Sequence, residues 1–296
     1  MLYGAHVSSS GGISNAVSRA HELGCDALQV FTQSPRMWRP TEHPPEEAAR
    51  FRERRVEAGV GAVVCHAVYL VNLASPHPEI HAKSVAALQA TMGTAAAIGA
   101  DAVVFHLGSH LGAGLAAALE RVAAPLRRLL ELTTDDLWLC LENCAGAGGT
   151  LGRSVDELAA VVDALGGHER LGVCLDSCHW WASGVDVTDP AVLHAAVAEL
   201  DRLVGLERLR CLHVNDAASA LGSNLDRHAS VGEGAMGAGL GTFLSHPAFQ
   251  ELPAILETPG PEGRGPDAME VRRLRELHRR GVRNARRRAA RRAAAG

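Results

Sequence analysis

The segment LGVCLDSCHWW, residues 171–181, has the pattern of a buried strand that ends in chemically active side chains. Its apolar run ends at Asp176, and Cys178 and His179 follow directly. Other short apolar or β-branched runs recur along the chain: LYGAHV, DALQVFT, VGAVVCH, DAVVFH, LWLCLE, LRCLHV and PAILE. Stretches with helical periodicity separate most of them, at residues 13–23, 45–58, 83–98, 115–132, 155–165 and 190–203. Strands that alternate with helices in this way predict an α/β fold, a single parallel (β/α)8 TIM barrel.

The domain organisation follows from the absence of any Pro-, Gly- or Ser-rich linker in the 296 residues. We expect one barrel domain at residues 1–280, followed by an Arg- and Ala-rich basic tail at residues 281–296 with the composition of a disordered segment. From residue 271 onward the chain carries eleven arginines and a single acid, Glu276, although the whole chain has a net charge of −4. The preceding body is therefore strongly acidic, and it would repel nucleic acid unless bound cations neutralised some of its carboxylates.

The composition also bears on the cellular location. No apolar run approaches the roughly 18 residues of a membrane span, and the N-terminal segment lacks the features of a signal peptide, so we expect a cytoplasmic protein without a membrane partner. The seven cysteines include no CxxC pair and are expected to be free thiols.

The ends of the predicted strands carry an unusual set of side chains: His6, His66, His106, Glu142, Asp176, His213 and Glu257. Only the second strand, which ends at Phe31 and Thr32, lacks such a residue. The C-terminal strand ends of a TIM barrel form one rim, so these groups should converge there. Imidazoles and carboxylates packed together need counter-charge, and metal ions would supply it.

Three cysteines, Cys140, Cys174 and Cys211, each precede one of these strand-end residues by two positions. Because strand side chains alternate, we expect these thiols one layer deeper in the barrel, as small apolar filling. Cys178 lies beyond its strand, where a thiolate ligand stays open as an alternative.

A further cluster lies after the seventh strand, in HVNDAASALGSNLDRHASVGEG. Asp226 and His228 are two residues apart, so they project to the same side of an extended segment, as chelation requires. The flanking glycines indicate a loop shaped to lie over a site.

These motifs together resemble endonuclease IV, the apurinic/apyrimidinic endonuclease family of DNA base-excision repair. The similarity runs through YGAHVSSSGGISNA, FTQSPRMW, YLVNLAS, FHLGSH, LENCAGAGGTLG, GVCLDSCHWWASGVD, the cluster above and ILETP, and so covers nearly everything before the basic tail. Leu107, Cys144 and the pair Trp180 and Trp181 depart from the family pattern, but none of them removes a ligand.

The resemblance implies three Zn²⁺ ions per chain, although Mn or Fe could use several of the same groups. It implies that one ion is held by His66, His106 and Glu142, a second by Glu142, Asp176, His213 and Glu257, and a third by His179, Asp226 and His228. Glu142 and Glu257 are the expected catalytic residues, the former as a bridge between two ions and the latter as the group that orients the nucleophile.

The implied reaction is hydrolysis of the phosphodiester 5′ to an abasic site, which leaves a 3′-hydroxyl and a 5′-deoxyribose phosphate, with a 3′-repair diesterase activity beside it. The partner would be double-stranded DNA with abasic or 3′-blocked sites, bound by a monomer. By the same resemblance, Arg36, Trp38, Tyr69 and Asn72 would contact the DNA.

Three other reactions or roles are alternatives. Cleavage by β-elimination needs an activated amine, and the only lysine, Lys83, begins a predicted helix away from the rim. Metal-dependent sugar isomerases and epimerases share this barrel, but they generally use one or two ions and lack the pair Asp226 and His228. A non-catalytic binder of damaged DNA would leave nine intact ligands without a purpose.

Overall fold

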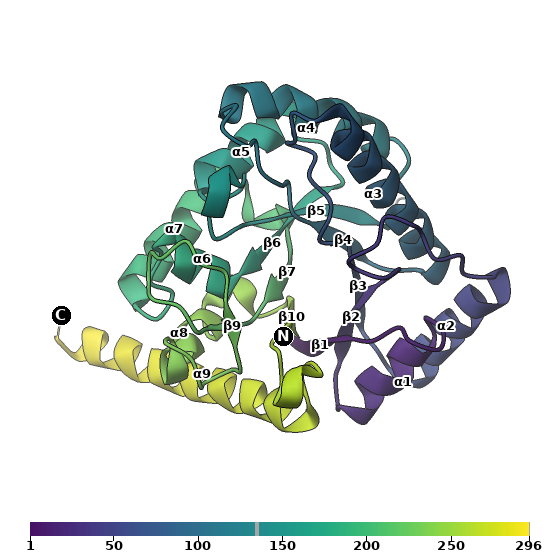
Figure 1. Cartoon of the computed structure of the whole chain (residues 1–296). Helices are drawn as coiled ribbons and strands as arrows, with labels where there is room; N and C mark the ends of the chain where they lie inside the picture. The colour runs from purple at the N-terminus through teal and green to yellow at the C-terminus, as the bar shows by residue number, and fades with distance from the viewer. Residues whose placement is uncertain (134–135, 296) are drawn as a thin grey trace.

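The computed structural model describes residues 1–133 and 136–295, and a closed barrel lies at its centre (Figure 1). Its strands are hydrogen-bonded in the order β1-β10-β7-β6-β5-β4-β3-β2, and every neighbouring pair is parallel. The bounds are β1 Leu2–Val7, β2 Ala27–Phe31, β3 Ala62–His66, β4 Ala102–Phe105, β5 Trp138–Glu142, β6 Leu171–Asp176, β7 Leu209–His213 and β10 Pro253–Leu256. The predicted TIM barrel is confirmed, and all eight C-terminal strand ends share one rim.

Helices surround the barrel on its outside (Figure 1). They are α1 Asn15–Glu22, α2 Pro45–Glu57, α3 Pro78–Ile98, α4 Leu115–Leu130, α5 Val155–Ala164, α6 Ser177–Ser183, α7 Pro190–Leu203, α8 Leu240–Leu244 and α9 Ala268–Ala295. Helix α3 begins at Pro78, earlier than periodicity predicted, because the fixed φ of proline suits the first turn of a helix. It ends at Gly99, whose φ of 68° is the left-handed cap that glycine adopts without steric cost. No helix within the described residues combines the length and apolar character needed to cross a bilayer.

The barrel interior is filled with small side chains beneath the rim. Cys140, Cys174 and Cys211 are completely buried and pack with Val64 and Val104 in one cluster. All seven cysteines are buried free thiols. The expectation that the three deeper cysteines serve as filling is confirmed, and burial raises the pKa of the Cys140 and Cys174 thiols, which keeps them neutral.

Two short elements were not predicted. β8, Asp216–Ala217, and β9, His228–Ala229, form an antiparallel pair outside the barrel sheet. They join the two ends of the loop at residues 218–227. The hairpin therefore returns the chain to the rim at His228.

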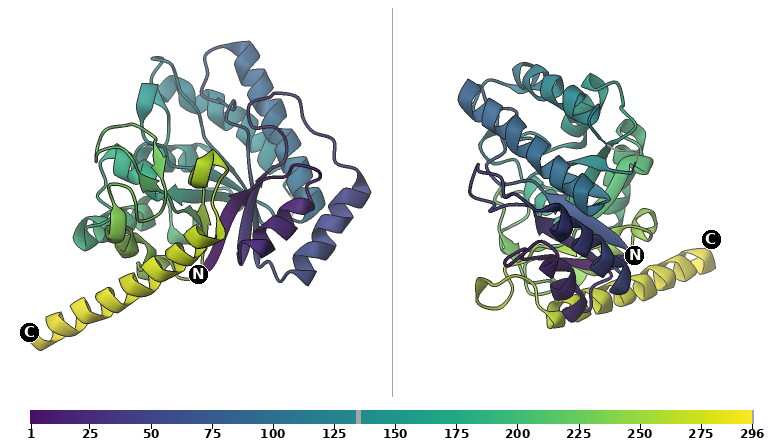
Figure 2. Two further views of the ribbon diagram at one scale, coloured as in Figure 1. Left: turned by 60° about the horizontal axis from the view of Figure 1, so that its bottom comes forward. Right: turned by 90° about the vertical axis from the view of Figure 1, so that its right-hand side faces the viewer.

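The C-terminal helix α9 differs from the expected tail. It packs on α8 and β1, and it continues without a break through the basic segment to Ala295, projecting from the body (Figure 2). The segment from residue 281 to residue 295 is helical in this structure. The physical reason is that Arg and Ala have high helix propensities and no glycine or proline interrupts residues 282–295. The proposed domain boundary at residue 280 stays a prediction.

Candidate metal centre

The barrel rim brings together the nine side chains predicted as ligands. Four of them are the last residues of their strands: His66, Glu142, Asp176 and His213. His106 and Glu257 directly follow β4 and β10, and His179 lies in the first turn of α6. Asp226 and His228 reach the same cluster from the hairpin loop, because His179 Nε2 lies 3.2 Å from Asp226 Oδ2 and His228 Nε2 lies 3.0 Å from Asp226 Oδ1.

Glu142 is the centre of the cluster and is completely buried. Its Oε2 lies 3.1 Å from His66 Nε2 and 3.3 Å from His106 Nε2. Its Oε1 lies 2.8 Å from His213 Nδ1 and 3.3 Å from His179 Nδ1. Each carboxylate oxygen therefore faces two imidazoles, which is the arrangement that a bridging carboxylate needs.

Hydrogen bonds on the outer side of the imidazoles fix which ring nitrogen faces the carboxylates. His66 Nδ1 donates to the Ala67 carbonyl at 2.7 Å, and His213 Nε2 donates to Gln29 Oε1 at 2.8 Å. In the neutral form of these rings, the nitrogens that face Glu142 carry lone pairs opposite a carboxylate, which is unfavourable unless a proton or a metal ion lies between them. Ligand atoms about 2.1 Å from one tetrahedral zinc ion are roughly 3.4 Å apart, close to these contacts. The donor set therefore fits divalent metal ions.

The second expected group also converges. Glu142, Asp176, His213 and Glu257 offer ligand atoms that all lie within 4.8 Å of one another. Glu257 Oε2 lies 3.1 Å from His213 Nδ1, and Glu257 is only 15% exposed. The expected third group, His179, Asp226 and His228, meets the same distance criterion. In the first expected group, His66 and His106 each approach Glu142 Oε2. Among the described residues, however, the groups of donor atoms that all lie within 4.8 Å of one another contain Glu142 with His66 and His213, or Glu142 with His106 and His179.

Within the cluster, the imidazoles and carboxylates shift one another's pKa values by more than burial does. Burial alone would raise the pKa of Glu142, but His106 and His213 outweigh it and hold that pKa well below its usual range. Burial alone would lower the pKa of His213, but Glu257 and Glu142 outweigh it and raise the pKa to about 10. Without metal the cluster is therefore held by protonated imidazoles between carboxylates.

Gln29 is a site residue that the sequence reading missed. It lies inside β2 and is completely buried. Its Nε2 donates to Glu257 Oε1 at 2.5 Å and to His6 Nδ1 at 2.9 Å, while its Oε1 accepts from His213. The second strand therefore contributes to the site, contrary to its apparent lack of a functional residue.

Two asparagines that follow ligand-bearing strands were also missed. Asn215 Nδ2 donates to Asp176 Oδ2 at 2.6 Å, and Asn215 Oδ1 accepts from the Glu257 backbone N–H at 2.9 Å. The Asn143 carbonyl accepts from His179 Nδ1 at 2.9 Å. The signal available in the sequence was their position, with Asn143 directly after Glu142 and Asn215 two residues after His213.

The loop that carries Asp226 and His228 is attached to α6 and to the segment before α5. Trp181 Nε1 donates to the Ser219 carbonyl at 3.0 Å, and the Trp181 carbonyl accepts from the Gly222 N–H at 3.1 Å. Arg153 Nε donates to Asn224 Oδ1 at 2.9 Å. Trp181, a departure from the family pattern, therefore holds the loop with its side chain and its backbone.

The carboxylate of Asp216 holds the glycine-rich segment that follows this loop. It is buried and accepts four backbone N–H groups at 3.0–3.1 Å, from Gly232, Gly234, Met236 and Gly237. A Cβ atom at Gly234 would lie 2.5 Å from Asp216 Oδ1, so this close approach requires glycine.

The other departures fill the protein interior. Leu107 is completely buried, and Trp180 packs edge-on against Phe243 with 6.5 Å between ring centroids. Cys144 Sγ lies 3.2 Å from Thr150 Oγ1. Cys178 Sγ lies within ligand distance of Asp176 and His228, but burial raises the pKa of this thiol, which opposes a thiolate ligand.

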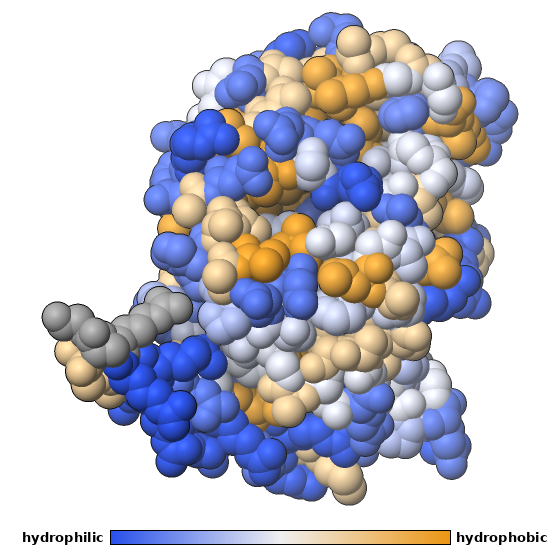
Figure 3. All heavy atoms as spheres, turned by 90° about the vertical axis from the view of Figure 1, so that its left-hand side faces the viewer, coloured by the Kyte–Doolittle hydropathy of each residue, from blue (hydrophilic) through white to orange (hydrophobic). Residues whose placement is uncertain are grey.

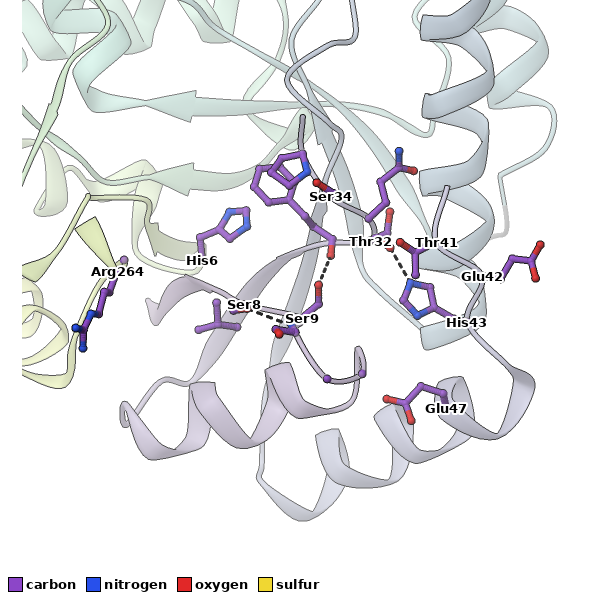
Figure 4. A pocket seen from close by; sticks show the side chains of 18 of the residues that line it. His6, Ser8, Ser9, Thr32, Ser34, Thr41, Glu42, His43, Glu47 and Arg264 are labelled. Atoms are coloured by element: carbon purple, nitrogen blue, oxygen red, sulfur yellow. Dashed lines mark hydrogen bonds between the residues drawn. The ribbon is translucent and has the colours of Figure 1, made fainter. Parts of the chain in front are cut away.

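A cavity of about 860 Å³ opens beside the metal cluster, between the loops that follow β1 and β2. His6 borders it, with Ser8, Ser9, Thr32 and His43 around it (Figure 4). His6 Nε2 is buried without a hydrogen-bond partner among the described residues. The cavity lining combines six hydroxyl-bearing side chains and two imidazoles with apolar groups and glycines.

The four residues expected to contact DNA lie on the loops after β2 and β3. Arg36 is exposed, Trp38 is half-buried against the core, and Tyr69 is 62% exposed and packs edge-on against Phe31. The Tyr69 N–H donates to the Pro35 carbonyl at 3.1 Å, which joins the two loops. Asn72 differs, because its side chain packs against Gly108 and its Oδ1 is shielded from solvent.

Comparison with known proteins agrees with this architecture. Residues 17–280 match the family model described as a xylose isomerase-like TIM barrel. The chain is 42% identical over 279 residues to a probable endonuclease 4 of Methanoculleus marisnigri, covering 94% of this chain and 99% of the relative. The crystal structure of endonuclease IV from Thermus thermophilus matches with a TM-score of 0.84 and 38% identity, covering 95% of this chain and all of the other. A D-tagatose 3-epimerase-like protein matches at 18% identity with a TM-score of 0.70, which shows the fold alone.

Proposed function

Because the chain belongs to the endonuclease IV family, we propose that it hydrolyses the phosphodiester 5′ to abasic sites in double-stranded DNA, with three zinc ions held at the rim. The products would be a 3′-hydroxyl and a 5′-deoxyribose phosphate. A 3′-repair diesterase activity would use the same site. The observation that carries the proposal is the pair Asp226 and His228, which adds a third donor group to a cluster that already fits two ions.

The ligand assignment follows the donor atoms. His66, His106 and Glu142 would hold one ion, and Glu142, Asp176, His213 and Glu257 a second. His179, Asp226 and His228 would hold the third. Divalent ions at such a site supply activation of water at neutral pH and stabilisation of negative charge on a phosphate.

The chain's own residues would orient the reacting groups. Glu257 is held on one oxygen by Gln29 and faces His213 with the other, so its carboxylate has a fixed direction in which to orient the attacking water. Each carboxylate oxygen of Glu142 contacts two imidazoles, so Glu142 would keep these two pairs of imidazoles at a constant distance from each other. Both carboxylates are kept ionised by the neighbouring imidazoles, which lower their pKa values against the effect of burial.

Recognition of DNA would involve the exposed loops beside the cluster. Arg36 offers a cation to a phosphate, and Tyr69 offers an exposed aromatic face next to His66. Trp38 would support this surface from its half-buried position. Asn72 would need to move out from Gly108 to reach a nucleotide, so we expect it to contribute least.

The experiment uses a labelled duplex with one tetrahydrofuran abasic analogue, which cannot undergo β-elimination. We expect metal-loaded protein to cut it to a single 3′-hydroxyl product and chelator-treated protein to leave it intact. Glu257→Gln should lose most of this activity, whereas Glu251→Gln, an exposed glutamate before β10, should retain it.

Absence of cutting by protein with a full metal content would refute the proposed activity. Turnover of a ketose by the same preparation would favour a sugar isomerase or epimerase. Full activity of Glu257→Gln would remove only the role of Glu257. The monomeric state and the cytoplasmic location stay predictions.

A further inference from the structure

The C-terminal half of α9 carries a row of arginines with no evident role in the fold. Its buried face ends with Leu277, His278 and Gly281. Further along the helix, Arg283, Arg286, Arg287 and Arg291 are exposed. At 100° per residue, the first three lie on the same side of the helix as the exposed Arg272 and Arg279, opposite the buried face.

These arginines lack partners within the part of the chain that the structure describes. Arg280 pairs with Glu276 and Arg273 with Glu233, but no hydrogen bond or ion pair involves Arg283, Arg286, Arg287 or Arg291. Figure 3 shows strongly hydrophilic side chains gathered on this projecting helix. The surface has a strong positive charge beside an acidic body.

The extension leaves the flank of the barrel beside α7 and α8 and leads away from the rim that carries the candidate metal ligands (Figures 1 and 2). The hydroxyl of Tyr3, near the start of β1, lies 2.7 Å from His278 Nδ1. Arg275 forms an ion pair with Asp26, which directly precedes β2. At residues 275–278 the helix has thus already reached the N-terminal ends of the strands. Residues 281–295 add about 20 Å of helix, which projects sideways from the body as well as away from the rim (Figures 1 and 2). A barrel strand of about five or six residues is roughly 17 Å long, and this length separates the N-terminal strand ends from the rim.

The arginine row lies beyond the part of the chain that the family model matches. The matching family model ends at residue 280. The Thermus thermophilus structure is covered completely while 5% of this chain is left over. The arginine row is therefore not part of the barrel that the family model describes.

We propose that Arg283, Arg286, Arg287 and Arg291 bind the phosphate backbone of a DNA segment other than the one held at the metal centre. The proposal rests on the proposed function only in that DNA is the polyanion this protein would meet. Because the helix leads sideways and away from the rim, a straight duplex seated across the rim would not run along these arginines. The chain would then hold two DNA segments at once and could pass from one to the other.

The chemistry of the extension favours nucleic acid over a lipid surface. Residues 283–295 contain only Arg, Ala and Asn, so the segment has no bulky apolar side chain to insert into a bilayer. Guanidinium groups bind phosphate oxygens in a bidentate geometry and need no base sequence. The contact should therefore be independent of DNA sequence and strongly dependent on salt.

The expected size of the effect follows from counter-ion release. Four phosphate contacts contribute a slope of about −3.6 to a plot of log affinity against log salt, or about a 12-fold loss for each doubling of salt. Removing the four charges should reduce the slope for undamaged duplex by about that amount.

The test compares the full-length chain with two full-length quadruple variants. In one, Arg283, Arg286, Arg287 and Arg291 become Gln, which removes charge but keeps a high helix propensity. In the other the same residues become Lys, which keeps the charge. Affinity for undamaged duplex is measured over a salt series, and circular dichroism checks that helix content is equal. We expect the Gln variant to lose affinity and slope and the Lys variant to retain most of both.

A bridging assay tests the two-segment arrangement. Protein is loaded on an immobilised duplex with an abasic analogue, and capture of a second, labelled undamaged duplex is measured. We expect capture by the original chain and the Lys variant but not by the Gln variant, with equal cutting of a short abasic duplex by all three. Equal salt slopes, or binding of the original chain to anionic vesicles but not to undamaged duplex, would overturn the proposal. Failure to cut abasic DNA would refute the proposed function while the salt series still tested the helix.

Discussion

Replacing Gln29 tests whether the hydrogen bonds behind the ligands support metal binding. In Gln29→Leu, His213 Nε2 loses its acceptor and Glu257 Oε1 loses its donor, at original distances of 2.8 and 2.5 Å. A buried donor left without a partner costs about 1–3 kcal/mol of stability. Loss of such a support for a ligand typically weakens metal affinity about 10–100-fold. That range corresponds to about 1.4–2.7 kcal/mol of binding free energy.

The assay is a competition between the metal-free protein and a chromophoric zinc chelator. The matched control is Gln33→Leu, because Gln33 is also buried and donates a hydrogen bond, to the Met37 carbonyl at 3.0 Å, but has no hydrogen bond to a ligand. We expect the control to bind zinc like the original protein and Gln29→Leu to lose affinity at one or more ions. A folded Gln29→Leu protein with unchanged zinc affinity would refute the reasoning.

Three further predictions concern the loop, the metal-free state and the rival chemistry. Trp181→Phe removes the hydrogen bond from the indole N–H to the Ser219 carbonyl, so we expect it to lower the free energy of unfolding by about 1 kcal/mol and to lower zinc affinity. An unchanged zinc titration would show that metal binding does not depend on this attachment of the loop. In metal-free protein, the raised pKa values of His213, about 10, and His228, about 9, give stabilisation that is complete below about pH 6.5 and lost as pH rises through those values. Zinc binding needs neutral imidazoles, so the difference in melting temperature between zinc-loaded and metal-free protein should widen with pH, and a constant difference would contradict this. Lys83→Arg should cut abasic DNA normally, and borohydride should trap no covalent adduct, because Lys83 is exposed and paired with Glu79 at 2.6 Å.

The fold was predictable because its signals are local. The alternation of apolar runs with helical periodicity defined all eight barrel strands, and chemically active residues at the strand ends marked the rim. The hairpin β8 and β9 was missed because two-residue strands carry no periodicity. The continuation of α9 to Ala295 was not predicted, because an Arg- and Ala-rich composition is compatible with either a charged helix or a disordered tail.

The site was predictable as far as its ligands stand at strand ends. Gln29 was missed because it lies within β2, and its contacts with His213 and Glu257 depend on the curvature and register of the closed barrel. Asn215 was missed because a single asparagine after a strand is common in loops. The DNA contact expected of Asn72 stays a prediction, and in this structure its side chain packs against Gly108.

The most direct test of the account is the metal content of the purified chain, measured by elemental analysis after dialysis against metal-free buffer. Nine converging donors predict three zinc ions per chain, and Asp226→Ala combined with His228→Ala predicts two. A content of one ion in the original protein, unchanged in the double variant, would contradict the claim that the rim and the hairpin loop together form a three-ion centre.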